Sequence, residues 1–460
     1  MTSKLTVAAV AVALTLPVGT RAAESTEIAE LRGMIEQLKN DYETRITTLE
    51  ARLAEAEGKA ERAAGEAREA ASAAARPVAP AGGTGQNAFN PGVALILSGL
   101  YASHSAASDG YRITGFNLPG EALEEFAPER GFSLAESELA VYANIDPYFY
   151  GALTLALAPD DTVGVEEAYV QTTALSHGLT LKAGRFFSGI GYLNEQHAHT
   201  WDFVDAPLAY QAFFGGQFGD DGVELRWLAP TDTFLELGAS VGRGSGFPGT
   251  GDDKNGIGAG ALFAHVGGDV GDSNSWRAGV SWLTTSPRDR EWDDVDAFAT
   301  PVVNSFDGRS RTWVLDGVWK WAPHGNPHYT NFKLQAEYMR RTERGDMLYD
   351  LDGAAQSSRY ETTQSGWYLQ GIYQFAPSWR IGLRGEQLDS GDVDYGGNNA
   401  NLLRPDYDPS RYALMLEFAP SEFSRVRLQL ARDESRQGVT DDQWFLQYQM
   451  SLGAHGAHKY

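Results

Sequence analysis

Apolar and polar residues alternate along most of the chain from Ala94 onward, in segments of about ten residues that are separated by turn residues. In the segment 411–418 every even-numbered residue is apolar, and the odd-numbered residues include the charged Arg411 and Glu417. Successive side chains of a strand point to opposite faces, so each segment forms a strand with one apolar and one polar face. The same pattern returns in the segments 332–338, 379–384, 425–430 and 443–452.

Alternation alone fits a soluble β-sandwich as well as a membrane barrel, and three features favour the barrel. The segments are long for sandwich strands, and their polar faces carry full charges, which suits a watery lumen. Aromatic residues also lie at segment ends, where membrane barrels carry girdles; these are Trp319, Trp321, Tyr373, Trp379, Phe418 and Trp444. The prediction is an all-β membrane barrel of about sixteen antiparallel strands over residues 93–460.

The links between these segments fall into two groups. Short links with the pattern Ala-Pro-Ser or Ala-Pro-Thr occur at 229–231, 376–378 and 419–421. Long links, which are acidic and rich in glycine, span 242–256, 286–308 and 388–409. Short turns at one rim and long loops at the other are typical of outer-membrane barrels.

The N-terminus has the pattern of an export signal. Lys4 gives a positive start, Leu5 to Pro17 is an apolar stretch too short to span a bilayer, and small residues follow near Ala22. This order is typical of a secretory signal peptide, which we assign to residues 1–23. The alternative is an ordinary buried helix at the N-terminus.

Residues 24–76 have a helical composition. Apolar residues recur in steps of three and four, first at Ile28, Leu31, Ile35, Leu38 and Tyr42, and then at Ile46, Leu49 and Leu53. This narrow stripe predicts a periplasmic α-helical coiled coil, followed by a Pro- and Gly-rich linker at 77–92. The residues of this stripe, the coiled-coil seam, favour dimers. Porin-type barrels, however, are commonly trimers, so a homotrimer is expected. A solvated spacer helix that does not self-associate is the alternative.

Composition excludes several other classes of protein. The chain carries 37 Lys+Arg against 61 Asp+Glu, which disfavours a nucleic-acid partner because phosphate binding needs a basic surface. It has no cysteine, so it has neither a disulfide framework nor a Cys-based metal site. Mean hydropathy is −0.34, and beyond the N-terminus no apolar run is long enough for a membrane helix.

The region 131–215 carries the most specific resemblance to a known family. Its motifs include Ala183-Gly-Arg-Phe186, Gly191-Tyr-Leu-Asn-Glu-Gln-His197 and Trp201-Asp-Phe203. They resemble a proteobacterial outer-membrane group related to phosphate-selective porins, whose members are often labelled porin or, loosely, TonB-dependent receptor. The resemblance implies an outer-membrane location and passage of small solutes. Phosphate selectivity is not carried over, because the polar faces mix arginine with glutamate instead of forming a strongly basic constriction.

Charged residues on the polar faces are the candidate channel lining, since charges inside a lumen set which ions enter. They are Arg226, Lys333, Arg380, Arg384, Arg411, Arg425, Arg427, Glu224, Glu337 and Glu386. The alternative is that they solvate the wall or pair across strands. A further stretch is predicted to fold inward as a constriction loop and to narrow the pore by hydrogen bonding; its candidate residues are Asn194, Glu195, His197 and His199.

Metal binding has some basis in the histidines. His197 and His199 would share a face on a strand, and together with His455 and His458 they could in principle hold zinc. Nothing in the sequence brings the two pairs together, so we predict neither a metal nor another cofactor. Aspartate pairs that lack the spacing of a calcium loop are expected in acidic surface loops, with cation-bridged contact to lipid phosphates as the alternative; they lie at 160–161, 220–221, 252–253 and 293–294.

Catalysis is not predicted. Ser188 is the serine nearest in sequence to His197, and the chain lacks a Gly-x-Ser-x-Gly elbow. The leading hypothesis is therefore a passive diffusion channel, with outer-membrane lipid, lipopolysaccharide and small solutes or ions as its partners. A substrate-specific receptor that depends on an energised partner, with metal among its substrates, is the second hypothesis. The third is an envelope tether in which the coil contacts the cell wall.

Overall fold

The computed structural model describes residues 91–107, 111–120, 130–159, 162–250 and 255–453, together with residues 36, 39, 47, 123 and 126. The chain divides into two units, Met1–Gln86 and Asn87–Tyr460. In the first unit Glu36, Lys39 and Thr47 are helical. The predicted signal peptide and the coiled-coil seam lie outside the described residues. No helix in the described part of the chain is long and apolar enough to cross a membrane.

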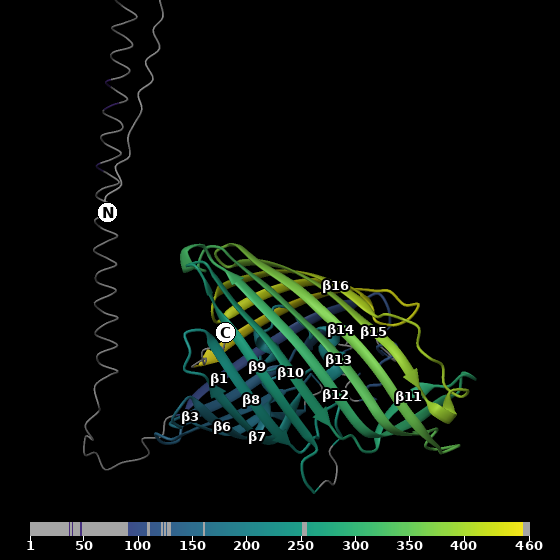
Figure 1. Ribbon diagram of the computed structural model, residues 1–460. Coiled ribbons are helices and arrows are strands. Elements are labelled where there is room, and N and C mark those ends of the chain that lie inside the picture. The colour runs from purple at the N-terminus through teal and green to yellow at the C-terminus, as the bar shows by residue number, and fades with distance from the viewer. Residues whose placement is uncertain are drawn as a thin grey trace, which may run out of the picture. The chain divides into compact units, whose positions relative to one another are not determined.

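The second unit is built around one antiparallel sheet (Figure 1). Its strands are β1 (Gly92–His104), β2 (Gly131–Leu134), β3 (Ser137–Asn144), β4 (Phe149–Leu157), β5 (Val163–Thr172), β6 (Leu179–Phe187), β7 (Gly219–Leu228), β8 (Phe234–Gly242), β9 (Ala259–Val270), β10 (Asn274–Thr285), β11 (Arg290–Val295), β12 (Pro301–Trp321), β13 (Asn331–Tyr349), β14 (Gln356–Ala376), β15 (Trp379–Asp394), β16 (Ser410–Ser421), β17 (Ser424–Glu434) and β18 (Asp441–Gly453). The helices whose full extent the structure describes are η1 (Ala198–Thr200), α3 (Leu208–Phe214), η2 (Pro323–Gly325) and η3 (Gly396–Asn398).

The sheet closes on itself, because β1 pairs with β18, as in the partners Leu97 and Met450. β2 and β3 both pair with β1, one after the other along it, and β10 and β11 share β12 in the same way. The eighteen segments therefore occupy sixteen positions round the barrel. The prediction of an all-β barrel of about sixteen antiparallel strands is confirmed.

The connections differ between the two rims. Short turns at one rim join β7 to β8, β14 to β15 and β16 to β17, at or beside the three predicted Ala-Pro links. The longer links at the other rim are 105–130, 188–218, 243–258 and 395–409. Two of the long loops were predicted wrongly in part. Part of 286–308 belongs to β11 and β12, and β15 runs to Asp394 inside 388–409.

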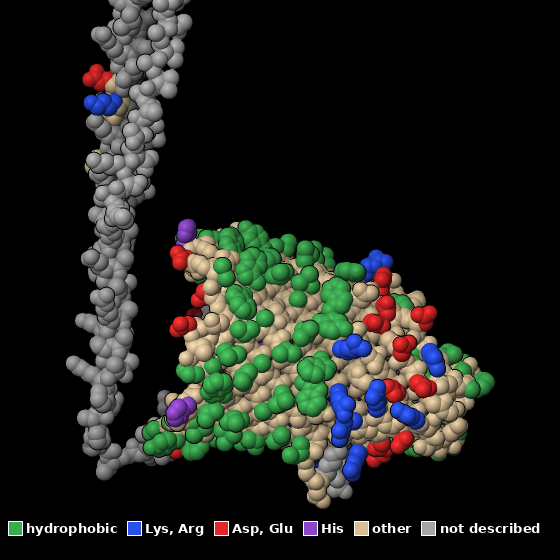
Figure 2. Space-filling view, in the orientation of Figure 1, with side chains coloured by type: hydrophobic (Ala, Val, Ile, Leu, Met, Phe, Trp, Pro, Cys, Tyr) green, Lys and Arg blue, Asp and Glu red, His purple; other side chains and the backbone are tan. Residues whose placement is uncertain are grey.

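Strands such as β12 extend past the apolar part of the wall. Arg309 and Arg311 on β12 are exposed on its outer face, where water replaces lipid and backbone pairing needs no apolar side chain. Figure 2 shows charged side chains gathered over this end of the strands. The Gly- and Asp-rich sequence of 286–308 and 388–409 therefore predicts loops, whereas strand pairing continues into both ranges.

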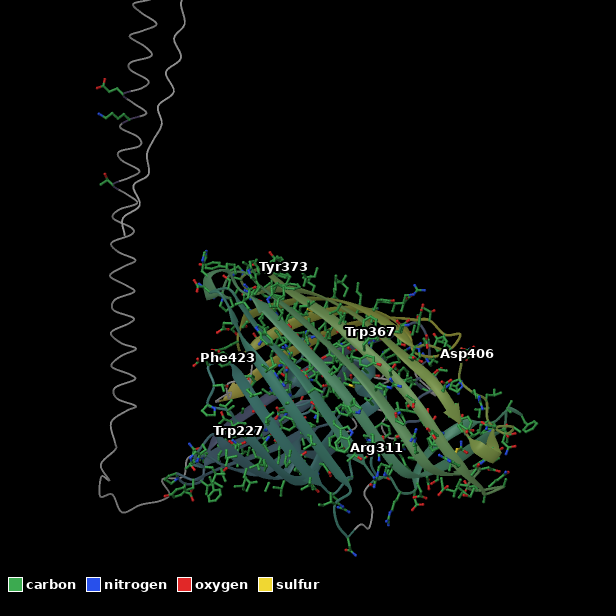
Figure 3. All side chains as sticks on the ribbon, in the orientation of Figure 1. Trp227, Arg311, Trp367, Tyr373, Asp406 and Phe423 are labelled. Atoms are coloured by element: carbon green, nitrogen blue, oxygen red, sulfur yellow. The ribbon has the colours of Figure 1, made fainter. Side chains whose placement is uncertain are left out.

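The outer wall is apolar and the inner wall is polar, which is the reverse of a soluble fold. Leu416, Leu428 and Leu446 lie side by side on β16, β17 and β18, and each is exposed by 37% to 44%. On the same strands Glu417, Arg427 and Gln447 are buried inside the barrel. Hydrophobic side chains cover the strands in Figure 2, and Figure 3 labels the exposed aromatic residues Trp227, Trp367, Tyr373 and Phe423. The predicted strand faces are confirmed.

We expect Leu428→Arg to lower the free energy of unfolding in lipid vesicles by about 2–4 kcal/mol, because it places a charge in the middle of the lipid-facing belt. Urea titration of the refolded barrel measures the change. Leu403→Arg is the matched control, since Leu403 is 67% exposed in the link 395–409. Equal effects of the two substitutions would contradict a lipid-facing wall.

Candidate functional site

One link of the barrel lies inside it. We call residues 188–218, between β6 and β7, the lumenal segment. It contains η1 and α3, and every residue of α3 is buried. Its backbone or side chains contact inward-facing residues of strands on all sides, among them Glu138 on β3, Glu224 on β7, Glu337 on β13 and Gln429 on β17. A segment that touches opposite walls must cross the lumen.

The lumenal segment packs into a small apolar core at this level of the barrel. Phe213 and Phe214 of α3 are buried, and so are Ile113 and Phe116 from the link between β1 and β2. Phe116 and Phe213 meet edge to face, with ring centroids 5.6 Å apart. The core also includes apolar inward residues of the wall, such as Met339. Burial of this surface stabilises the inward position of the segment.

Asn194 ties the two ends of the segment together. Its Nδ2 donates to the carbonyl oxygens of Ser188 (2.8 Å) and Phe218 (2.9 Å), and its Oδ1 accepts from the Phe218 N–H (2.7 Å). Gly191 has φ +66°, and a Cβ there would meet Glu337 Oε2 at 2.3 Å. The turn at Gly191 therefore needs glycine both for its conformation and for its close approach to the wall.

Three wall carboxylates accept hydrogen bonds from the backbone of the segment. Glu337 accepts from the N–H groups of Tyr192 (3.1 Å) and Leu193 (3.0 Å). Glu386 accepts from the Leu208 N–H at the start of α3 (2.5 Å), and Glu224 accepts from the Gly189 N–H (3.2 Å). The result is that N–H groups in the middle of the lumen are satisfied by buried charges of the wall.

Two aspartates of the segment pair with basic residues of the wall. Asp202 lies 2.5 Å from Lys333 Nζ and 3.3 Å from Arg380. Burial opposes the charge of Asp202, but these two cations outweigh it and lower its pKa to about 2.

The second aspartate, Asp205, accepts from Arg384 (2.5 Å), from Arg411 and from Gln429 (3.2 Å). Burial again opposes the charge, and Arg411 and Arg384 outweigh it, so the pKa of Asp205 is also lowered to about 2. Both aspartates are therefore charged over the whole neutral range.

All ten predicted channel-lining residues face into the barrel, and each contacts the lumenal segment. Arg226 binds Glu195, and Arg425 and Arg427 donate to the carbonyl oxygens of His199 and Trp201. Many also pair within the wall, as Arg380 and Arg427 do with Glu417. The predicted constriction residues lie inside the barrel, but the inward segment is longer than predicted. The sequence prediction missed Asp202 and Asp205.

A cluster of carboxylates surrounds the two histidines of the segment. His197 Nδ1 lies 2.9 Å from Glu166 and 3.3 Å from Glu138, and its Nε2 lies 3.0 Å from Glu167. His199 Nδ1 lies 2.6 Å from Glu138. The ligand atoms of Glu138, His197 and His199 all lie within 4.8 Å of one another, so this group could hold a metal ion. Nothing in the sequence pattern links Glu138, Glu166 and Glu167 to the two histidines, although each lies on a strand.

The remaining candidates fall elsewhere. His455 and His458 lie outside the described residues, as do the aspartate pairs at 160–161 and 252–253. Asp220 accepts from the N–H groups of Gly244 (2.6 Å) and Ser245 (3.3 Å), which fixes a loop. Both ring nitrogens of His197 face glutamates and not Ser188.

We expect Asp202 and Asp205 to stabilise the barrel above pH 4 and to stop doing so near pH 2. Their lowered pKa values mean that the charged form is favoured on folding, and the stabilisation is lost as pH falls through the folded value. The difference in unfolding free energy between the wild type and the double variant Asp202→Asn, Asp205→Asn should be constant from pH 7 to 4. It should then shrink by about 2 kcal/mol per carboxyl toward pH 2. If this difference in unfolding free energy shrank between pH 7 and 5, the lowered pKa values of Asp202 and Asp205 would be contradicted.

The closed barrel, its apolar outer wall and its charged interior define the class of transmembrane β-barrels. The chain belongs to the family of an uncharacterized protein of Aquifex aeolicus. The two are 30% identical over 402 residues, and the match covers 82% of this chain and 81% of that protein. No protein-family model matches the chain.

Solved structures to which the chain is similar include the outer membrane channel DcaP of Acinetobacter baumannii. It has a TM-score of 0.48 and 12% identity over 79% of this chain and 96% of that chain. OprB of Pseudomonas putida has a TM-score of 0.44 and 15% identity over 79% and 94% of the two chains. An anion-selective porin from Comamonas acidovorans has a TM-score of 0.45 and 9% identity over 79% and 99%.

Proposed function

We propose that this chain is an outer-membrane porin, a channel for passive diffusion of small solutes or ions, whose width is set by the lumenal segment. The observation that carries the proposal is the pairing of an apolar outer wall with a charged inner wall, to which all ten predicted residues belong, in one closed barrel. A barrel of sixteen strands is wide enough for an aqueous channel unless loops fill it. The short-turn and long-link rims support an outer-membrane location.

The test is single-channel recording of the purified full chain in a planar lipid bilayer. We expect steady openings whose current grows with salt concentration. Reversal potential in asymmetric salt then reports whether cations or anions pass. A receptor would be supported instead if the protein showed no channel openings but bound a ligand tightly. A heat-modifiable shift on a gel would verify that this protein is folded.

We also propose that residues 24–76 form a periplasmic coiled coil in a homotrimer. The seam from Ile28 to Leu53 supports self-association. β1 begins at the rim of short turns, where Gly92 pairs with Tyr142, and in outer-membrane barrels that rim faces the periplasm. Crosslinking of the full chain and of a variant without 24–76 tests this: trimers are expected from the full chain, and monomers alone would contradict it.

Lipopolysaccharide is the proposed lipid partner of the outer wall. Arg309, Arg311, Arg340 and Arg344 are exposed on the outer face beyond the apolar belt, where phosphate groups of an outer leaflet would lie. Figure 3 labels Arg311 among them. Replacement of Arg309 and Arg311 by glutamine should lower the amount of lipopolysaccharide that co-purifies with the barrel. An unchanged amount would contradict the proposal.

A further inference from the structure

We propose that Glu138, Glu166, His197 and His199 form a binding site for a divalent transition-metal cation of the Zn²⁺ type, inside the barrel between the lumenal segment and the wall. His197 directly precedes η1 and His199 lies within it, Glu138 is on β3, and Glu166 is on β5. Two imidazole nitrogens and two carboxylate oxygens are a ligand set that Zn²⁺ takes in proteins.

Ligand atoms of Glu138, His197 and His199 lie within 4.8 Å of one another. The Nδ1 atoms of both histidines face Glu138, at 3.3 Å from His197 and 2.6 Å from His199. Glu166 approaches the same Nδ1 of His197, at 2.9 Å. Ligands about 2.0–2.2 Å from a tetrahedral ion lie a little over 3 Å apart. The closest pair, Glu138 and His199, would therefore have to separate by roughly 0.7 Å or more to admit the ion.

The charges of the cluster favour a bound cation. The side chains of Glu138, Glu166 and Glu167 are only 2%, 9% and 11% exposed. In the described part of the chain no lysine or arginine forms an ion pair with these three glutamates. Elsewhere in the lumen the pattern differs, because Asp202 and Asp205 each have two basic partners. Three buried carboxylates around two imidazoles leave negative charge that a divalent ion would offset.

A third glutamate orients one of the ligands. His197 Nε2 lies 3.0 Å from Glu167 Oε2, on the side of the ring away from Glu138 and Glu166. Metal-binding histidines commonly donate their other ring N–H to a carboxylate in this way, which fixes the tautomer and turns the free nitrogen toward the metal. Glu167 is therefore a positioning residue of the site. The His197 side chain is 21% exposed, which leaves one side for entry of the ion.

The experiment is metal titration of the folded full chain in detergent after EDTA treatment. All proteins carry His455→Gln and His458→Gln, so that the terminal histidines do not contribute. We expect one Zn²⁺ per chain by calorimetry, and visible absorption bands of a nitrogen- and oxygen-liganded ion with Co²⁺. His199→Gln should abolish tight binding, and Glu167→Gln should weaken it by about 10–100-fold.

His265→Gln is the matched control, because His265 is also buried in the barrel and pairs with a single glutamate, Glu236, at 3.1 Å. The affinity of the His265→Gln protein for Zn²⁺ should equal that of the wild type. Absence of Zn²⁺ binding and of Co²⁺ bands in the wild type would overturn the proposal, whatever the variants do. Unchanged affinity in His199→Gln, with the fold verified by its heat-modifiable shift, would also overturn it. These readouts do not depend on channel activity, so they separate this proposal from the proposed function.

Discussion

Excision of the lumenal segment should raise the single-channel conductance several-fold. Phe187 at the end of β6 and Gly219 at the start of β7 are direct partners in the ladder, so Asn-Gly in place of 188–218 would close the two strands as a tight hairpin. The variant loses α3, which lies in the middle of the barrel. A sixteen-strand barrel without this filling has room for an aqueous channel.

The same excision should turn the pore toward anions. Glu195, Asp202 and Asp205 leave with the segment, whereas their basic partners on the wall remain. Those partners are Arg226, Lys333, Arg380, Arg384 and Arg411. Conductance and the reversal potential in asymmetric salt measure the two effects. As a control, Asn-Gly in place of the exposed residues 352–354 should change neither. An excised barrel that folds, yet conducts like the wild type, would show that the segment does not set the pore.

The faces of the strands could be predicted from sequence because lipid and lumen make opposite demands on neighbouring residues. Leu428 and Arg427 differ by one position, and one lies exposed on the outer wall while the other is buried inside. This alternation is local, so it can be recognised within a single segment of the sequence. The ends of the strands were harder to predict. The outer face of β12 there carries Arg309 and Arg311, whereas its inner face carries the buried Val302 and Phe306, so the usual pattern is reversed.

The partners of the charged residues could not be predicted in the same way. Asp205 lies 179 residues from Arg384 and 206 from Arg411, and His199 lies 61 residues from Glu138. Only closure of the barrel brings them together. The alternation placed Arg384, Arg411 and the other candidate residues on inward faces, but it does not indicate whether such charges meet water or a folded segment. Here they hold the segment in place.

Asp205→Asn should detach the C-terminal part of the lumenal segment from the wall. The carboxylate of Asp205 joins Arg384 and Arg411, whose side chains are only 1% and 4% exposed. Removing one partner of a buried charge cluster costs about 3–5 kcal/mol. We expect the lower end of this range, because Arg384 keeps Glu386 at 2.7 Å and Arg411 keeps Asp433 at 3.7 Å. Since 1.4 kcal/mol corresponds to a factor of ten in an equilibrium constant, the population of the detached state should rise by about a hundredfold or more.

Amide hydrogen exchange of α3 measures this change directly, and brief high-conductance openings should accompany it. Asp221→Asn is the control, because Asp221 pairs with Arg185 at 2.7 Å in an exposed position, where an ion pair contributes about 1 kcal/mol or less. Adding Arg411→Gln to Asp205→Asn should recover part of the protection, since it removes one of the two buried cations that lose Asp205 as a partner. If exchange in α3 is equally slow in the Asp205→Asn and Asp221→Asn proteins, the apolar packing of Phe213 and Phe214 alone holds the segment, and the charged wall does not anchor it.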